Sequence, residues 1–323
     1  MSELTATTEL GGLPTFLALD TVSVLDGTRR GASVQIDETY LDGQRTAIET
    51  IDAESRFERR LRSVDRTREI YDEVDIDIAS FTEENLWDAS RRYRELLQRL
   101  PETQYLKRAF PETCFVVPEW IRSPSEVTYG PRVYFFREDD APDPESIIEA
   151  NIEAVLEDTR EAFDRYRGRL HGYPDCCLER FSSADRESDL GPEEASVEPI
   201  ADYIDDDRLA AGPDPTVSIT EIVSGLFETP DAYAFFVREF FPEPGCETAR
   251  RRGIEVYETL SEVVSETLVQ DHFRMNAGWN YVLARSLREV DPGRPAPGLL
   301  GREHLFSYLP LSVTSSLPRY REE

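Results

Sequence analysis

Lysine is almost absent from this chain of 323 residues. Lys107 is the only lysine among 36 basic residues, so arginine supplies nearly all of the positive charge. The 65 acidic residues outnumber the basic ones and give a formal net charge of −29. This charge argues against a broad nucleic-acid-binding surface, because phosphate recognition needs a basic footprint. An acidic, lysine-poor surface suits a cytosol of high salt, where charges are strongly screened, and we interpret it as the adaptation of an extreme halophile.

Long apolar runs are also absent. No segment of the sequence approaches the roughly 20 apolar residues that a membrane-spanning helix needs, so we expect no membrane partner. Residues Met1–Phe16 lack a basic region followed by an apolar core, and we therefore expect no secretory signal. The sequence predicts a soluble protein of the cytoplasm, where thiols stay reduced.

Several familiar catalytic motifs are missing. The chain has no CxxC pair, no HExxH, no phosphate-binding glycine loop and no GxSxG. Phosphoryl transfer, dinucleotide redox chemistry and α/β-hydrolase chemistry therefore have no support in the sequence. With only four cysteines and three histidines, a metal or thiol site has few residues from which to form.

The hydrophobic pattern predicts an α+β protein that is mostly helical. We expect a mixed N-terminal region with short strands over residues 1–140 and a helical region over residues 141–323. An acidic stretch at about residues 183–213 has few large apolar groups and indicates a solvated, dispensable insertion.

Particular segments carry this prediction. Val22, Val24, Val34 and Ile36 alternate with polar residues on either side of a turn signal at Asp26-Gly27, which favours strands. Further strands are expected at 114–117 and 133–136. Helices are expected at about 144–168, 219–227 and 232–240, and in a long pattern after the sequence FPEPGC. Asp143 and Pro144 fit the cap and the first turn of the first of these helices.

The sequence HGYPDCCLERF, residues 171–181, holds two adjacent cysteines. Pro174 suits the first turn of a short helix, so Cys176 and Cys177 are expected near the helix N-terminus. There the helix dipole and the free N–H groups favour a thiolate, the form that binds metal or attacks electrophiles. We discount a disulfide between these neighbours because it requires a strained ring.

A second cysteine-bearing helix start follows in FFPEPGCETARRRG, residues 240–253, where Cys246 comes after a Pro-Gly break. We expect Cys177 and Cys246 to lie close together as the primary metal ligands or nucleophiles. Cys176 and His171 are expected to support them as ligands. His272 is a further candidate ligand, on a helix face with Asn276 and Asn280 that suggests a polar lining.

Zinc or iron fits such a set of sulfur and nitrogen ligands. The function that follows is an enzyme-like use of a metal or thiolate site, with a small-molecule substrate. The alternative is a non-catalytic interaction or structural protein whose cysteines pack the core, since free cysteine is among the most buried residue types. Cys114, inside an apolar strand, is assigned to the core outright.

The two cysteine segments resemble the paired motifs of domain-of-unknown-function family 483, a family of archaeal and bacterial proteins. Its members carry Gly-Tyr-Pro-x-Cys-Cys and then a segment with proline and cysteine ahead of a helix. The resemblance covers roughly residues 170–253. Members often have a further cysteine near the position of Glu243, and its absence here weakens a four-sulfur site. The resemblance implies that the motif is important, without implying a reaction.

Overall fold

The computed structural model describes residues 10–72, 82–122, 127–183, 191–286 and 295–321, which fold into two compact units. Unit 1 runs from Arg30 to Gly172. Unit 2 combines the N-terminal segment that ends at Arg29 with the chain from Tyr173 onward. The predicted division after residue 140 does not coincide with these limits, because residues 141–172 belong with the strands of unit 1.

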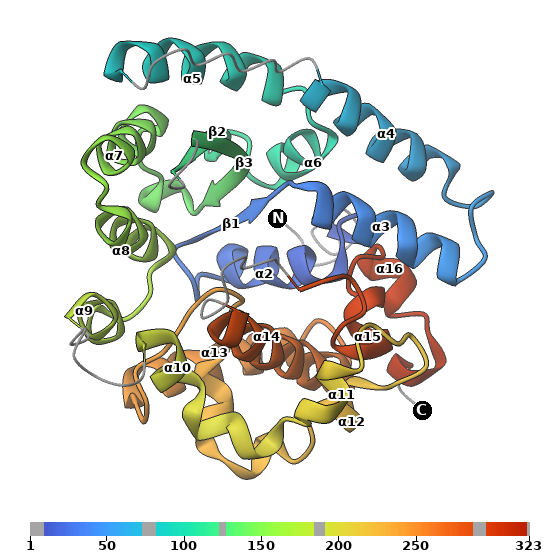
Figure 1. The fold of residues 1–323 in the computed structure, drawn as a ribbon. Helices are drawn as coiled ribbons and strands as arrows, with labels where there is room; N and C mark the ends of the chain where they lie inside the picture. The colour runs from blue at the N-terminus through green and yellow to red at the C-terminus, as the bar shows by residue number, and fades with distance from the viewer. Residues whose placement is uncertain (1–9, 73–81, 123–126, 184–190, 287–294, 322–323) are drawn as a thin grey trace. The chain divides into compact units, whose positions relative to one another are not determined.

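Unit 1 is built on an antiparallel three-stranded sheet. Its elements are β1 (Gly31–Gln35), α3 (Glu38–Thr50), α4 (Glu58–Asp72), α5 (Glu83–Leu97), α6 (Pro101–Ala109), β2 (Cys114–Arg122), β3 (Val127–Phe136), α7 (Pro144–Glu157) and α8 (Arg160–His171). A short 3-10 turn, η1, spans Glu138–Asp140. The strand order is β1-β3-β2, with Val34 opposite Val133 and Cys114 opposite Phe135. Helices α5, α6 and α7 pack on β2, and α8 packs on β1 (Figure 1).

One long helix was expected over residues 144–168, and the structure has two. Asp143 accepts a hydrogen bond from the N–H of Glu145 and caps α7, as the sequence indicates. Asp158 then adopts a left-handed conformation, with φ at 56°, and ends α7 before α8 begins. Aspartate tolerates this conformation better than most residues, and the apolar periodicity does not report such a break.

Unit 2 is helical in its described residues. Its elements are α2 (Thr15–Asp26), α9 (Asp175–Ser183), α10 (Pro192–Val197), α11 (Asp206–Ala210), α12 (Ile219–Ile222), α13 (Glu247–Ser261), α14 (Glu266–Ser286), α15 (Gly301–Phe306) and α16 (Leu311–Thr314). Short 3-10 turns are η2 (Glu198–Tyr203), η3 (Leu226–Glu228), η4 (Pro230–Ala234) and η5 (Pro318–Tyr320). Helix α14 packs against α10, α12, α13 and α15 and so occupies the centre of this unit (Figure 1). The α+β, mostly helical fold class is thereby confirmed.

The strand predicted around Val22 and Val24 is wrong, because both residues lie in α2. This helix is buried on nearly all sides, so its apolar residues do not show a helical stripe. Helix α2 ends at Gly27, which takes φ at 97°. The turn signal at Gly27 therefore marks a helix end instead of a hairpin.

The helices predicted at 219–227 and 232–240 are also largely absent. In their place are the four-residue helix α12 and the 3-10 turns η3 and η4. Gly225 adopts φ at 67° and Pro230 begins η4, so the backbone breaks where an apolar pattern continues. The long pattern after FPEPGC is helical as expected, divided between α13 and α14.

The acidic stretch at 183–213 is not a solvated insertion in its described part. Val197, Ile200 and Ile204 are buried in one hydrophobic cluster with residues of α12 and α14. Its acidic groups cap the turns, as Asp205 does by accepting the N–H of Arg208 at the start of α11. Three buried apolar side chains thus hold the stretch in the core despite its polar composition. Residues 184–190 lie outside the described residues.

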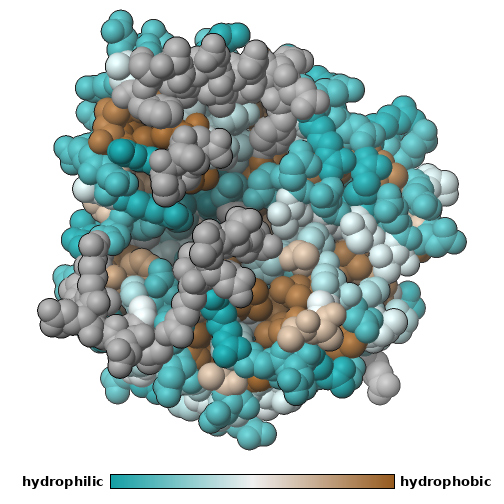
Figure 2. Space-filling view, viewed as in Figure 1, coloured by the Kyte–Doolittle hydropathy of each residue, from teal (hydrophilic) through white to brown (hydrophobic). Residues whose placement is uncertain are grey.

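Hydrophilic side chains dominate the face drawn in Figure 2. This agrees with the large excess of acidic residues in the sequence. Among the described residues, none of the helices combines the length and the apolar character that crossing a membrane requires.

Candidate metal centre

Three cysteine sulfurs come together in unit 2. Cys176 and Cys177 lie in the first turn of α9, and Cys246 is the N-cap residue of α13. The three Sγ atoms all lie within 4.8 Å of one another, and those of Cys176 and Cys246 are 3.2 Å apart. The predicted proximity of Cys177 and Cys246 is therefore confirmed. Cys176, expected as a supporting ligand, also belongs to the group.

Local sequence explains both helix starts. The N–H groups of Cys177 and Leu178 donate to the carbonyl oxygen of Pro174, at 3.0 and 3.1 Å, so α9 begins immediately after this proline. Before α13, Gly245 adopts φ at 69°, a conformation that favours glycine, and turns the chain into Cys246. Two helix N-termini therefore meet at the sulfurs, and each contributes partial positive charge.

Backbone N–H groups donate to two of the sulfurs. The N–H of Glu243 donates to Cys177 Sγ at 3.4 Å, and the N–H of Ala249 donates to Cys246 Sγ at 3.5 Å. Cys177 is buried, Cys246 is partly buried and Cys176 is exposed. The group is thus anchored on its inner side and open to solvent at Cys176.

The environment favours neutral thiols when no metal is bound. Burial raises the pKa of Cys177 strongly, despite the N–H donated by Glu243. Burial and the neighbouring Cys246 also raise the pKa of Cys176. Because the thiolate is the nucleophilic form, a raised pKa argues against either residue as a free nucleophile. A bound cation would reverse this preference, since metal binding replaces the protons.

A small hollow of about 10 Å³ adjoins the group. Cys177, Arg180, Phe181, Phe241 and Glu243 contribute to its lining. This volume corresponds to about one water molecule. The hollow is therefore too small for an organic molecule in this conformation.

The other predicted ligands lie elsewhere. The metal-ligand group found among the described residues contains neither His171 nor His272. His171 ends α8 in unit 1, where its ring packs near Tyr134, with the ring centroids 6.0 Å apart. His272 is buried in α14 with its Nε2 3.3 Å from the Nδ2 of Asn276. Burial, with the charges of Arg238 and Arg29, lowers the pKa of His272 to about 3.

Cys114 is buried in β2, in agreement with its assignment to the core. Burial raises the pKa of this thiol to about 12. Its sulfur is not part of the three-sulfur group. It therefore offers an internal comparison for the three clustered thiols.

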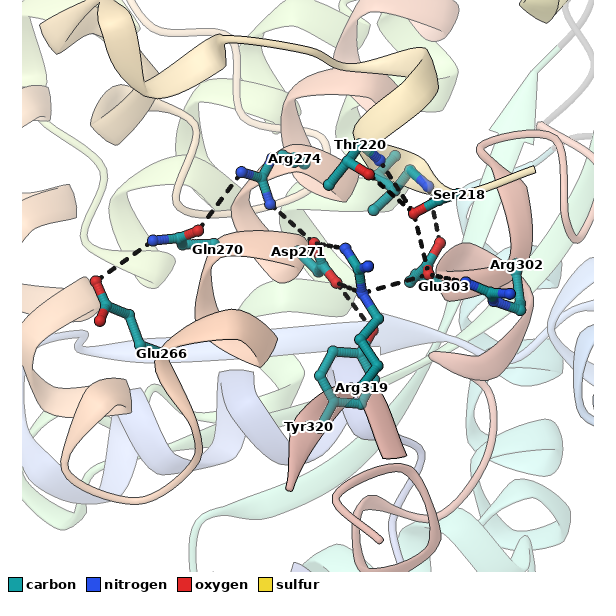
Figure 3. Close-up of polar contacts among 11 residues, drawn as sticks. Ser218, Thr220, Glu266, Gln270, Asp271, Arg274, Arg302, Glu303, Arg319 and Tyr320 are labelled. Carbon is teal, nitrogen blue, oxygen red and sulfur yellow. Dashed lines mark hydrogen bonds and ion pairs between the residues drawn. The ribbon is translucent and has the colours of Figure 1, made fainter. Parts of the chain in front are cut away.

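The sequence did not reveal a buried carboxylate cluster around Asp271 and Glu303, which Figure 3 draws. Asp271 Oδ1 accepts from Arg274 and Arg319, and its Oδ2 accepts from Arg319 and from the Tyr320 hydroxyl. Glu303 accepts from the Ser218 hydroxyl, at 3.2 Å, and from a backbone N–H of α12, at 2.7 Å. All four carboxylate oxygens are paired, so this cluster fastens the C-terminal segment to α14 and α15.

No family model, curated protein or solved structure matches the chain. The resemblance to domain-of-unknown-function family 483 accordingly stays a prediction. The functional argument rests on the geometry of the three sulfurs.

Proposed function

We propose that this protein binds a zinc or iron ion through Cys176, Cys177 and Cys246. The close approach of three sulfurs from two helix starts carries the proposal. With Zn–S bonds near 2.3 Å, a tetrahedral site places its sulfurs roughly 3.8 Å apart. The separations here, 3.2 Å for one pair and at most 4.8 Å for the others, are compatible with that value. Small side-chain rotations would therefore suffice to hold the ion.

The surroundings suit thiolates that are bound to a cation. The N–H groups that donate to Cys177 and Cys246 are outer contacts of the kind that orient metal ligands. The two helix N-termini offset part of the negative charge of three thiolates. Since the metal-free thiols have raised pKa values, binding releases protons and the affinity should increase with pH.

Three protein ligands leave a position for water or a substrate. Catalytic zinc sites keep such a position, whereas closed structural sites use four protein ligands. Cys176 is exposed, so this position would be reached from solvent. We therefore propose an enzyme-like role with a small-molecule substrate, in which the ion polarises the substrate or activates water. We further propose that the protein works in the reducing cytosol of a halophile, where these thiols stay available.

The alternative is a non-catalytic interaction or structural protein whose cysteines only pack the core. The burial of Cys177, which is 2% exposed, favours this reading for one of the three residues. It does not account for Cys176, whose exposed thiol has little core to fill. Metal content separates the two functions.

The test is metal analysis of protein purified under reducing conditions without chelators, followed by titration of the apo-protein with zinc and with cobalt(II). We expect about one equivalent of metal per chain, and a thiolate-to-cobalt absorption band. Cys176→Ser, Cys177→Ser and Cys246→Ser should each lower the affinity at least tenfold. Cys114→Ala is the matched control and should bind as the wild type does.

Failure of the reduced wild-type protein to bind either ion would disprove the metal site. Equal affinity in Cys114→Ala and Cys246→Ser would do the same. Additive losses of stability in the cysteine variants, without bound metal, would then favour core packing.

A further inference from the structure

Helix α14 carries a buried polar face that the proposed metal site does not use. His272, Asn276 and Trp279 are spaced by four and three residues, so they lie on one side of the helix. None of the three is more than 4% exposed. Buried polar atoms normally have hydrogen-bond partners, so the partners of these residues decide what the face does.

The two aromatic side chains at one end of this face each have an N–H without a partner. His304 Nδ1 accepts the N–H of Leu300 at 3.3 Å, so in the neutral ring the proton is on Nε2. His304 Nε2 and Trp279 Nε1 are both buried and have no partner within the described part of the chain. The ring centroids of Trp279 and His304 are 5.5 Å apart, so the two side chains are neighbours in the core.

The pair formed by His272 and Asn276 leaves equal numbers of unpaired donor and acceptor atoms among the described residues. With Asn276 Nδ2 donating to His272 Nε2, the ring proton is on Nδ1. His272 Nδ1 and Asn276 Oδ1 then remain as one donor and one acceptor, both buried and unpaired in the described structure. Rotation of the amide exchanges these roles and leaves the balance unchanged.

Arg238 adds a further donor and a positive charge. Its guanidinium carbon lies 5.0 Å from the centroid of the Trp279 ring, and Nη2 donates to the Ser307 hydroxyl at 3.2 Å. The Nε of Arg238 is buried and has no partner among the described residues. Arg29 brings a second positive charge, which Asp20 partly offsets through an ion pair at 2.7 Å. The unpaired donors of this cluster thus exceed its unpaired acceptors.

We propose that the cluster around Trp279, His304 and Arg238 binds a small inorganic anion of the halide class. A halide accepts N–H donors from several directions and carries no proton of its own, so it satisfies the surplus donors. The rings and the guanidinium group approach one another to 5 or 6 Å, which excludes a large organic anion. A metal cation does not fit, because the free groups are mainly donors and the nearby guanidinium groups repel it. A water molecule pairs some donors but adds donors of its own.

The site is tested by unfolding the full chain at increasing chloride concentration, with gluconate replacing chloride at constant ionic strength. Above the dissociation constant, each tenfold rise in chloride should lower the unfolding equilibrium constant of the wild type about tenfold. Trp279→Phe keeps a ring and removes the N–H, and it should weaken the apparent chloride affinity at least tenfold.

Trp120→Phe is the matched control, because Trp120 is equally buried and its Nε1 already donates to the Ser90 hydroxyl at 2.8 Å. It should keep the chloride dependence of the wild type. Crystals grown in bromide should show an anomalous peak within hydrogen-bonding distance of Trp279 Nε1 and His304 Nε2. Water density without anomalous signal, or the same chloride dependence in both tryptophan variants, would overturn the proposal. Neither result bears on metal binding by the cysteines.

Discussion

Two neighbouring buried residues of α14, Asp271 and His272, differ in how fully their polar atoms are hydrogen-bonded. Asp271 is fully buried, and both of its carboxylate oxygens are paired with arginine or tyrosine donors. His272 is almost as buried, yet one ring nitrogen has no partner in the described structure. Asp271, whose oxygens all have donors, has no hydrogen-bonding capacity left for a ligand and serves as a structural cross-link. His272 retains a ring nitrogen that can form a further hydrogen bond, and a binding site requires such free capacity.

The carboxylate cluster should be the more costly one to break. Asp271→Ala leaves Arg274, Arg319 and the Tyr320 hydroxyl without their shared acceptor, and should lower the free energy of unfolding by about 3–5 kcal/mol. Asp88 forms the same i,i+3 pair with Arg91, but both side chains are about two-thirds or more exposed, at 71% and 67%. Asp88→Ala should therefore cost under about 0.5 kcal/mol. Denaturant unfolding of both variants measures the contrast, and similar losses would remove the distinction.

Acidification should lower the stability of the folded protein through His272. His272 is neutral in the folded protein because burial lowers its pKa to about 3, whereas the unfolded residue titrates near pH 6.5. The unfolded state therefore binds more protons as the pH falls through this range, and stability decreases by about 1.4 kcal/mol per pH unit for this residue. His272→Gln lacks the titrating group, so its stability should fall less steeply between about pH 6 and pH 4. Parallel pH profiles for wild type and variant would show that His272 is not held neutral.

The smallest expected effect comes from removing a single indole N–H, which is paired in Trp120 and, within the described part of the chain, unpaired in Trp279. Trp120→Phe and Trp279→Phe remove the same volume, but only Trp120 loses a hydrogen bond within the protein. In chloride-free gluconate, Trp120→Phe should therefore cost about 1 kcal/mol more than Trp279→Phe. The comparison uses the difference in the free energy of unfolding, measured by denaturant titration. An equal or larger loss in Trp279→Phe would mean that its N–H already has a partner.

The cysteine segments were the most predictable part of the site. A proline in a first turn and a Pro-Gly break identify helix starts from residues within a few positions of each cysteine. The same local reasoning placed Cys114 in a strand and Asp143 at a helix cap. The same reasoning made Cys177 a primary ligand and Cys176 only a supporting one, whereas Cys176 is the residue whose sulfur lies 3.2 Å from that of Cys246. Sequence alone does not show which sulfur of an adjacent pair faces a partner 70 residues away.

Long-range packing accounts for the predictions that were wrong. The alternation at Val22 and Val24 resembles a strand until α2 is seen to be enclosed on nearly all sides. The acidic stretch resembles a mobile insertion until Ile200 and Ile204 are found in the core cluster. In both cases a few buried contacts override the average character of the segment, and those contacts are formed by residues distant in the chain.

The sequence by itself determined the helix-rich α+β class, the large excess of acidic residues and the two helix starts that present cysteines. These features follow from composition, periodicity and capping, which act between residues close together in the chain. Tertiary structure alone decided that Cys176 lies 3.2 Å from Cys246, that Asp271 is saturated and that Trp279 and His304 are not. Whether a buried polar atom finds a partner depends on side chains from separate elements that meet only in the folded core, so no local pattern encodes it.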